Sequence, residues 1–360
     1  MRALGWTVVD EPVTGRRPRR VVPRVVPLLL AVGFALVALC TPARAAVETR
    51  AVTTLAAGPG STPNAPTLPV EQRFYAPGPW EVTSVRGIGC CDSGGSKFDA
   101  WYPTDLGRDG TRHPVITFGD GWLSTPDRYD YFLRHLASWG FVVVATESTD
   151  TGSGRQILDA AHWMLRQDES ASPFHDRLDT GAVGAVGHSE GASGVLNAMV
   201  NSGGLISTTI TIELPPRVYC TTTPANCADT RKLTGGGIFL VNGSVDALIS
   251  PSYLPVPTAL LGPQSNSAYQ SAAPGSVSTV WATLNGADHS DVQGQPSCAG
   301  AHGSCTNGVY GYLGYPTAWL MARLRRDDEA RSAFVDQTGE LFRETTNWSN
   351  QHSNIRAGDD

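Results

Sequence analysis

A doubly wound α/β sandwich, in which helices cover both faces of a mostly parallel sheet, is the fold class that this sequence predicts. Short apolar segments without alternation recur along the chain, for example 114–118 (PVITF) and 141–146 (FVVVAT). Strands that are buried on both faces have this composition. Segments with helical spacing separate several of them, and right-handed crossovers then lay the helices against one sheet. With 360 residues, of which 41% are hydrophobic, the chain can bury a sizeable core.

The first half of the expected sheet follows a lead-in. Residues 46–75 are rich in Ala, Thr, Pro and Gly, which is typical of a flexible segment, so a single folded domain is expected over 76–345. The apolar residues of 126–138 recur on one helix face, and Gly140 ends that helix. The elements expected in this half are strands at 80–88, 97–103, 114–118 and 141–146 and helices at 126–138 and 153–166.

The second half continues the same alternation. Residues 182–187 (AVGAVG) predict a strand, and the small residues of 190–201 predict a helix directly after it. The other elements expected here are strands at 208–213, 237–242 and 278–284 and a closing helix at 314–326. The residues after 346 are polar, so 346–360 is expected to be a frayed C-terminal tail.

The N-terminus has the order of a secretory signal peptide. A basic segment at 16–24 precedes 13 uncharged, apolar residues at 28–40, and an A-x-A pattern follows at 43–45. The apolar run is shorter than the roughly 20 residues that span a bilayer. We therefore predict a signal peptide at 1–45 and a secreted protein, with an uncleaved anchor as the alternative. Paired arginines leave both the Sec and the twin-arginine route open.

The charge balance limits the classes of partner. The chain carries 27 basic and 33 acidic residues, a formal net charge of −6. Its first 45 residues hold seven Arg against two acidic residues, so residues 46–360 carry −11. An acidic protein is a poor ligand for phosphate backbones and anionic lipids. We expect no nucleic-acid partner and no stable membrane partner after cleavage.

Six cysteines follow the predicted cleavage site, and an even number in an oxidising compartment favours disulfides. Cys220 and Cys227 bracket six residues, as do Cys298 and Cys305, so each pair is expected to close its own loop. The adjacent cysteines at 90–91 either form a vicinal bridge or stay reduced, and their state remains open. A metal site is the rival interpretation, but the spacing of zinc ligands is missing, so no metal is expected.

Residues 187–191 (GHSEG) form a G-x-S-x-G motif between a predicted strand and a predicted helix. A turn of this kind forces its central residue into a strained conformation and lifts the Ser189 hydroxyl to the edge of the sheet. The alternative is a serine that merely caps a helix. The position of the two glycines favours the nucleophile.

A serine hydroxyl needs a base, and the base needs an acid to orient it. Asp246 follows the strand 237–242, and His289 follows the strand 278–284. Both therefore stand at carboxyl ends of strands, where such sheets carry their sites, and the order Ser, acid, His fits a strand–serine–helix turn. The alternatives are an ordinary turn aspartate and a surface histidine. Lesser candidates for the acid are Asp288, Asp291 and Glu213.

The developing oxyanion of an acyl-transfer reaction needs two hydrogen-bond donors. The backbone amide of Glu190, directly after the serine, is the first candidate. The loop 119–122 (GDGW) follows a buried strand and supplies the second, for which we choose the Trp122 amide. The Trp122 indole would then form a wall of the acyl pocket. The alternative is a core tryptophan whose amide is bonded elsewhere.

Taken together, these residues resemble the secreted bacterial cutinases and polyethylene terephthalate hydrolases of the α/β-hydrolase superfamily, near the dienelactone hydrolases. The resemblance covers about residues 80–325 and is strongest in the stretches 113–146, 155–165, 176–191, 239–246 and 285–289. It implies an α/β-hydrolase fold and a serine carboxylic-ester hydrolase. It also implies Ser189 as nucleophile, Asp246 as acid and His289 as base, with the amides of Trp122 and Glu190 as oxyanion donors.

Two positions depart from that family. Glu190 stands where its members usually have Met, and 214–217 (LPPR) stands where they place Pro-Trp, whose indole grips aromatic polyesters. These departures favour ester hydrolysis in general over the hydrolysis of polyesters.

The hypothesis is therefore an acyl-enzyme esterase without a cofactor. Its substrates would be short- to medium-chain esters, as small molecules or at a cutin- or polyester-like surface, and a monomer is expected. A peptidase or amidase, an acyltransferase and a lipase are alternatives on the same three residues, because a fold does not fix the reaction. A secreted binding protein without catalysis is the alternative from another class.

Overall fold

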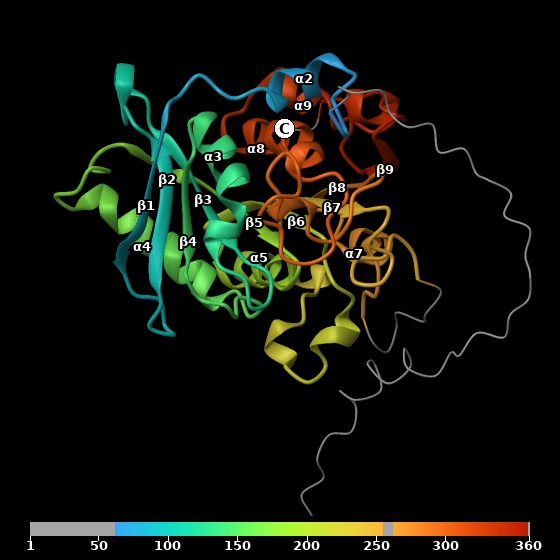
Figure 1. The fold of residues 1–360 in the computed structure, drawn as a ribbon, viewed down its shortest axis with the longest axis horizontal. Coiled ribbons are helices and arrows are strands. Elements are labelled where there is room, and N and C mark those ends of the chain that lie inside the picture. The colour runs from blue at the N-terminus through green and yellow to red at the C-terminus, as the bar shows by residue number, and fades with distance from the viewer. Residues whose placement is uncertain (1–61, 255–261, 359–360) are drawn as a thin grey trace, which may run out of the picture. The chain divides into compact units, whose positions relative to one another are not determined.

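The strands of the computed structural model, which describes residues 62–254 and 262–358, form one sheet (Figure 1). Its order is β1-β2-β4-β3-β5-β6-β7-β8-β9. Neighbours from β4 to β8 are parallel, and antiparallel pairs flank them at both edges. The strands are β1 (Val82–Cys90), β2 (Lys97–Pro103), β3 (His113–Gly119), β4 (Val142–Thr146), β5 (Leu178–His188), β6 (Ile206–Ile212), β7 (Gly237–Gly243), β8 (Ser278–Leu284) and β9 (Trp348–Ser353).

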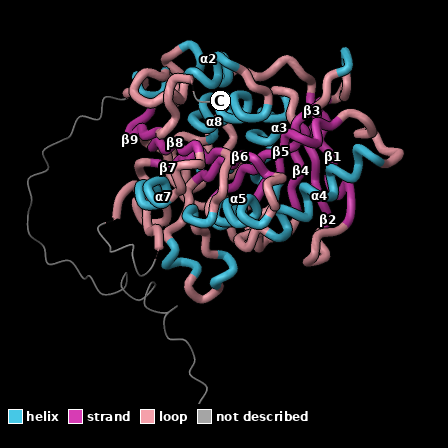
Figure 2. The backbone as a smooth tube through the Cα atoms, turned by 180° about the vertical axis from the view of Figure 1, so that it is seen from behind, coloured by secondary structure: helices cyan, strands magenta, loops and turns pink. Residues whose placement is uncertain are grey.

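Helices cover both faces of this sheet, as Figures 1 and 2 show. Apolar residues of α2, α3, α8 and α9 pack on one face, and those of α4, α5 and α7 pack on the other. The helices are α2 (Pro69–Tyr75), α3 (Asp130–Ser138), α4 (Arg155–Glu169), α5 (Glu190–Asn201), α7 (Asn266–Ala272), α8 (Gly314–Leu324) and α9 (Asp328–Ser332). The predicted doubly wound α/β class is therefore confirmed. Within the described ranges, no helix combines the length and apolar composition that a bilayer span requires.

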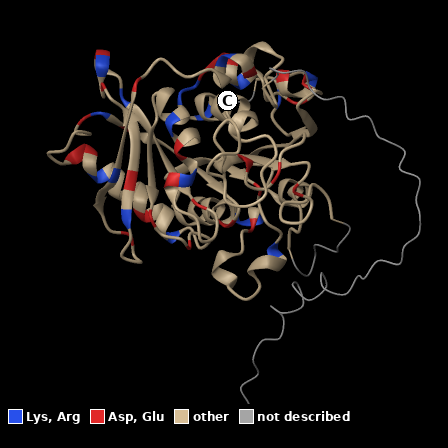
Figure 3. Cartoon of the chain, in the orientation of Figure 1, with Lys and Arg blue, Asp and Glu red and all other residues tan. Residues whose placement is uncertain are grey.

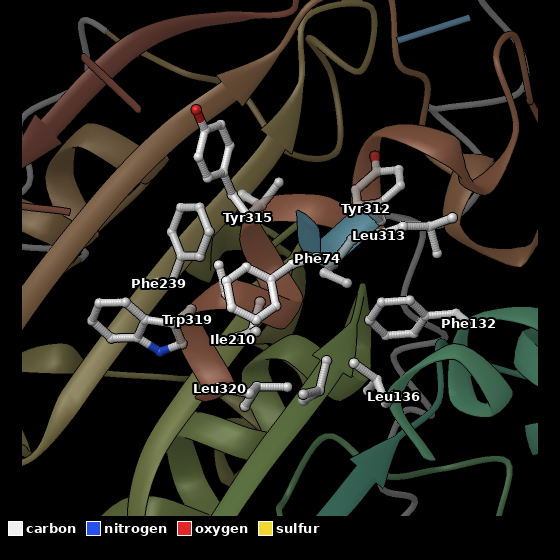
Figure 4. Packing of buried hydrophobic residues seen from close by; sticks show 14 of the residues in the cluster. Phe74, Phe132, Leu136, Ile210, Phe239, Tyr312, Leu313, Tyr315, Trp319 and Leu320 are labelled. Carbon is white, nitrogen blue, oxygen red and sulfur yellow. The ribbon is translucent and has the colours of Figure 1, made fainter. Parts of the chain in front are cut away.

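The unbroken apolar strands alternate between two cores. Phe239 of β7 packs on the α8 face, while Leu240 packs on the α5 face. Figure 4 shows the first core, where Phe239 and Ile210 of the sheet lie beside Trp319 of α8. Burial of each such side chain stabilises the fold by about 2 kcal/mol. Because both faces of these strands are buried, their sequences do not alternate between apolar and polar residues.

Two expectations about the ends of the domain were wrong. The segment expected as a frayed tail at 346–360 contains β9, which pairs antiparallel with β8, and its Trp348 is buried. The described part of the lead-in contains α2, whose Phe74 is fully buried. In the polar C-terminal segment and in the Pro-rich lead-in alike, a large buried aromatic side chain, Trp348 or Phe74, holds the backbone against the domain. The predicted signal peptide at 1–45 and the lead-in before residue 62 lie outside the described residues.

Residues of both charges are interspersed over the outer elements (Figure 3), but three glutamates are buried, one in α2 and two, Glu340 and Glu344, near it in space. One of them, Glu71, is 2% exposed and accepts a hydrogen bond from Trp348 Nε1 at 2.7 Å. Burial raises the pKa of Glu71 to about 8. The hydrogen bond from Trp348 lowers this pKa, and the negative charges of Glu344 and Glu340 raise it further. The folded protein thus holds this proton more tightly than the unfolded chain does. Its stabilising effect is complete below pH 4.5 and is lost as the pH rises to about 8.

We expect Glu71→Gln, which keeps an acceptor for Trp348 but cannot ionise, to stabilise the protein at alkaline pH. The gain in unfolding free energy should grow from near zero at acidic pH to about 5 kcal/mol once Glu71 is ionised. Urea denaturation at a series of pH values measures it, with the exposed Glu81→Gln as the control. A gain that stays constant or shrinks as the pH rises would contradict this assignment.

Candidate active site

Ser189 stands at the sharp turn between β5 and α5. Its backbone has φ 56° and ψ −120°, a left-handed conformation that costs a side-chain-bearing residue about 1–3 kcal/mol. Its amide donates to Ile212 O of β6 at 2.9 Å, which ties the turn to the neighbouring strand. The half-buried hydroxyl is thereby held at the carboxyl edge of the sheet.

The two glycines of the motif permit this turn by close backbone contact. A Cβ atom on Gly191 would lie 2.1 Å from Gly119 O, and one on Gly187 would lie 2.2 Å from Gly191 O. Both distances are far inside van der Waals contact with backbone atoms, which cannot move aside. The motif thus needs glycine at these two positions because a larger residue would not fit. The backbone strain of the turn is a separate matter and falls on Ser189.

The structure brings together the three residues that the sequence predicts from strand order. Ser189 Oγ lies 3.0 Å from His289 Nε2, and His289 Nδ1 lies 2.6 Å from Asp246 Oδ2. A carboxylate only accepts, so Nδ1 carries the proton and the Nε2 lone pair faces the serine hydroxyl. This is the tautomer that a general base requires.

Asp246 is 5% exposed and is held as an anion. Burial opposes its ionisation, but the hydrogen bond to His289 and the N–H of Ile249, which donates to Oδ1 at 3.0 Å, outweigh it. The pKa of Asp246 is therefore below its ordinary value. A fixed negative charge beside Nδ1 stabilises the imidazolium that proton transfer from serine would produce.

His188, which precedes the serine, is buried in the turn, at 1% exposure. Its Nε2 lies 2.7 Å from the carbonyl oxygen of His289, and its Nδ1 lies 2.9 Å from Tyr129 Oη. Burial, together with the charge that His289 can carry, lowers its pKa to about 3, so it stays neutral. Its Nε2–H must then donate to the His289 carbonyl, which fixes the backbone of that residue.

The candidate oxyanion donors lie beside the serine. A Cβ atom on Gly121 would lie 3.4 Å from Ser189 Cβ, so the loop after β3 packs on the turn. The Gly121 amide donates to Tyr129 Oη and the Leu123 amide to Thr149 O. Neither the Trp122 amide nor the Glu190 amide donates to an acceptor in the described part of the chain. The Trp122 side chain is 70% exposed, so it is not the core residue of the alternative interpretation.

The Glu190 side chain turns toward the loop that the Cys220–Cys227 disulfide closes. Its Oε1 accepts from Asn226 Nδ2 at 2.9 Å. Burial and the charge of Asp150 raise the pKa of Glu190 to about 7, and the Asn226 hydrogen bond partly offsets them. The carboxyl beside the serine is thus partly neutral near neutral pH, and it anchors the disulfide loop to α5.

The other predicted cysteine pair, Cys298–Cys305, is also a disulfide, and Cys90 is joined to Cys91. The lesser acid candidates have structural contacts. Asp291 accepts from the amides of Thr306 and Asn307, which directly follow the Cys298–Cys305 loop, and Asp288 accepts from the His289 amide at 2.8 Å. Neither is the hydrogen-bond partner of the imidazole.

Two groups of side chains have the types and proximity of metal ligands. Glu213, Asp246 and His289 place one ligand atom each within 4.8 Å of one another, but the last two are paired as described. In the other group, formed by Asp291, Cys298 and Cys305, the two sulfurs are joined in a disulfide. We assign neither group to a metal. The first shows a contact that sequence reasoning missed, since Glu213 lies beside Asp246.

Comparison with known proteins matches residues 56–214 to the PET hydrolase-like family. Bis(hydroxyethyl) terephthalate hydrolase of Streptomyces coelicolor is 32% identical over 128 residues, which are 34% of this chain and 39% of that protein. Cutinase est1 and cutinase est2 of Thermobifida alba are each 28% identical over 126 residues, 33% of this chain and 40% and 39% of theirs. The chain thus matches about two fifths of the length of these relatives.

The family match includes Ser189 and the loop after β3 but ends before Asp246 and His289. The assignment of Asp246 and His289 to the candidate site is therefore based on their distances to each other and to Ser189. The order and direction of the strands are those of an α/β-hydrolase. Over residues 56–214 this chain is therefore similar to the PET hydrolase-like family, and its sheet has the strand order of an α/β-hydrolase.

Proposed function

We propose that this protein is a secreted serine hydrolase of carboxylic esters. The observation that carries the proposal is the hydrogen-bonded chain from Ser189 Oγ through His289 to the Asp246 carboxylate. The names of the matched relatives, a terephthalate diester hydrolase and two cutinases, support the same class of reaction.

The proposed reaction has two steps. His289 Nε2 takes the proton of Ser189 as Oγ attacks the ester carbonyl, and the amides of Trp122 and Glu190 donate to the oxyanion. The imidazolium then protonates the departing alcohol, which leaves an acyl-enzyme. Water attacks the acyl-enzyme with His289 again as base, and the acid is released. Asp246 keeps its charge throughout and orients the ring.

Exposed apolar side chains around the serine favour apolar esters as substrates. They stand in the loops that follow β3, β6 and β7, at the carboxyl edge of the sheet where Ser189 lies. Their exposed fractions are 70% for Trp122, 63% for Leu123, 51% for Tyr219 and 74% for Leu248. Tyr219 Oη donates to Leu248 O at 3.2 Å, which links two of these loops. Apolar surface of this kind binds acyl chains or aromatic diacids by burial.

Export is part of the proposal. All six cysteines of the described residues are joined in pairs, and such bonds persist in oxidising compartments. The signal-peptide pattern at 1–45 gives the same localisation.

A hydrolysis panel with an active-site probe tests this function. We expect a fluorophosphonate to label Ser189, and p-nitrophenyl esters of short and medium chain to be hydrolysed faster than peptide anilides. Bis(hydroxyethyl) terephthalate, a polyester film and an added alcohol acceptor extend the panel to polymer hydrolysis and acyl transfer. Absence of labelling together with intact esters would indicate a binding protein, and faster cleavage of anilides would indicate an amidase.

A further inference from the structure

Glu213 follows β6 directly and is fully buried, at 0% exposure. Its backbone is left-handed, with φ 52°, and its amide donates to Val241 O of β7 at 2.9 Å. A glycine would adopt this conformation without strain. The backbone path alone therefore gives no reason for a glutamate here, and its side chain has to be considered.

The two carboxyl oxygens of Glu213 have different surroundings. Oε1 accepts from the Gly243 amide at 2.7 Å and from Tyr312 Oη at 2.8 Å. Oε2 meets no donor among the residues that the structure describes. Its neighbour is the carboxylate of Asp246, because one oxygen of each carboxyl group and one ring nitrogen of His289 lie within 4.8 Å of one another. Two carboxyl groups can share a hydrogen bond only if one of them carries a proton.

The surroundings decide which carboxyl carries it. Asp246 receives donors from His289 and from the Ile249 amide, so its anion is stabilised. Burial and the adjacent Asp246 charge raise the pKa of Glu213 well above its ordinary value. The other titratable groups around the pair are Tyr312 from the turn before α8, Tyr219 from the loop after β6, and His188. None of these supplies a permanent positive charge that would ionise Glu213.

We propose that Glu213 is a positioning residue, a neutral carboxylic acid whose Oε2–H donates to the Asp246 carboxylate and holds it against His289 Nδ1. The inference rests on the proposed function, because it gives Glu213 a role in the same reaction. Glu213 touches neither Ser189 nor the ester. It acts by fixing the direction of Asp246 and by taking part of the negative charge of that carboxylate.

Two near-isosteric substitutions separate this role from others. Glu213→Gln keeps an oxygen for Gly243 and Tyr312 and offers an N–H to Asp246, so kcat should stay within about twofold. Glu213→Met removes the donor, and kcat should fall roughly 10- to 100-fold with KM little changed. In this variant the carboxylate of Asp246 becomes a stronger acceptor and stabilises the imidazolium. The acid limb of the kcat profile should therefore move to higher pH.

Glu71→Met is the matched control, because it deletes another buried carboxyl, in α2. It should change stability and leave the acid limb where it is. If Glu213→Gln is as impaired as Glu213→Met, the neutral-donor role is wrong. If Glu213→Met folds and keeps both its kcat and its pH profile, Glu213 does not position Asp246.

Two measurements that need no substrate test the proposal even if Glu213→Met does not fold or if no ester is hydrolysed. The infrared difference spectrum of the native protein against Glu213→Gln at pH 8 should show the carbonyl stretch of a protonated carboxyl in the native protein alone. The deshielded resonance of the His289 Nδ1 proton should persist in Glu213→Gln. A missing carboxyl band overturns the proposal, whereas unreacted esters overturn the proposed function only.

Discussion

Ser189→Ala should lower kcat for p-nitrophenyl esters by a factor on the order of 10⁵ to 10⁶. The substitution removes the atom that forms the acyl-enzyme, so the burst of p-nitrophenol should vanish together with steady-state turnover. Water can still be positioned near His289, but without the covalent intermediate only the contribution of substrate binding and of the oxyanion donors remains. Stopped-flow and steady-state absorbance measurements check both.

The matched control is Ser193→Ala, which removes a serine one helical turn further along α5. It should keep both the burst and the steady-state rate. Turnover in Ser189→Ala within tenfold of the native protein would show that the ester reacts elsewhere, and the nucleophile would have to be sought again.

The central sheet was predictable because its strands are buried on both faces. The segment at 114–118 lies inside β3, and the segment at 141–146 begins one residue before β4 and ends with it, because strands between two helical layers have such uninterrupted apolar runs. The closing strand β9 was not predictable. It reads WSNQHS, and its position at the sheet edge leaves most of its side chains half-buried, so that it lacks both the apolar run and a clear alternation.

The chain order of Ser189, Asp246 and His289 was informative because each follows a strand of one parallel sheet. Parallel strands end at the same edge, so residues 43 and 100 positions from His289 are brought into contact. The contact between Glu213 and Asp246 was not visible in the same way. It depends on the left-handed backbone of Glu213 and on the closeness of β6 and β7, neither of which a local pattern encodes.

Asp246→Asn should lower kcat by a factor of roughly 10⁴, although the side chain keeps its size and shape. The Ile249 amide donates to one oxygen of Asp246, and His289 Nδ1 faces the other. An asparagine must keep its oxygen toward Ile249, so its NH₂ group faces Nδ1. Two donors cannot share a hydrogen bond, and the proton of His289 moves to Nε2. That nitrogen then has no lone pair to take the proton of Ser189.

Asp288→Asn is the matched control for this second prediction. Oδ1 of Asp288 accepts from the His289 amide at 2.8 Å, and an asparagine oxygen can accept this hydrogen bond too. Asp288→Asn should therefore lower kcat by at most a few-fold, although it replaces a carboxylate by an amide beside the same histidine. The nitrogen chemical shifts of His289 report the tautomer directly, and they should interchange in Asp246→Asn alone. If Asp246→Asn keeps its tautomer and its rate, another carboxyl orients the ring, and Glu213 is the group within reach to do so.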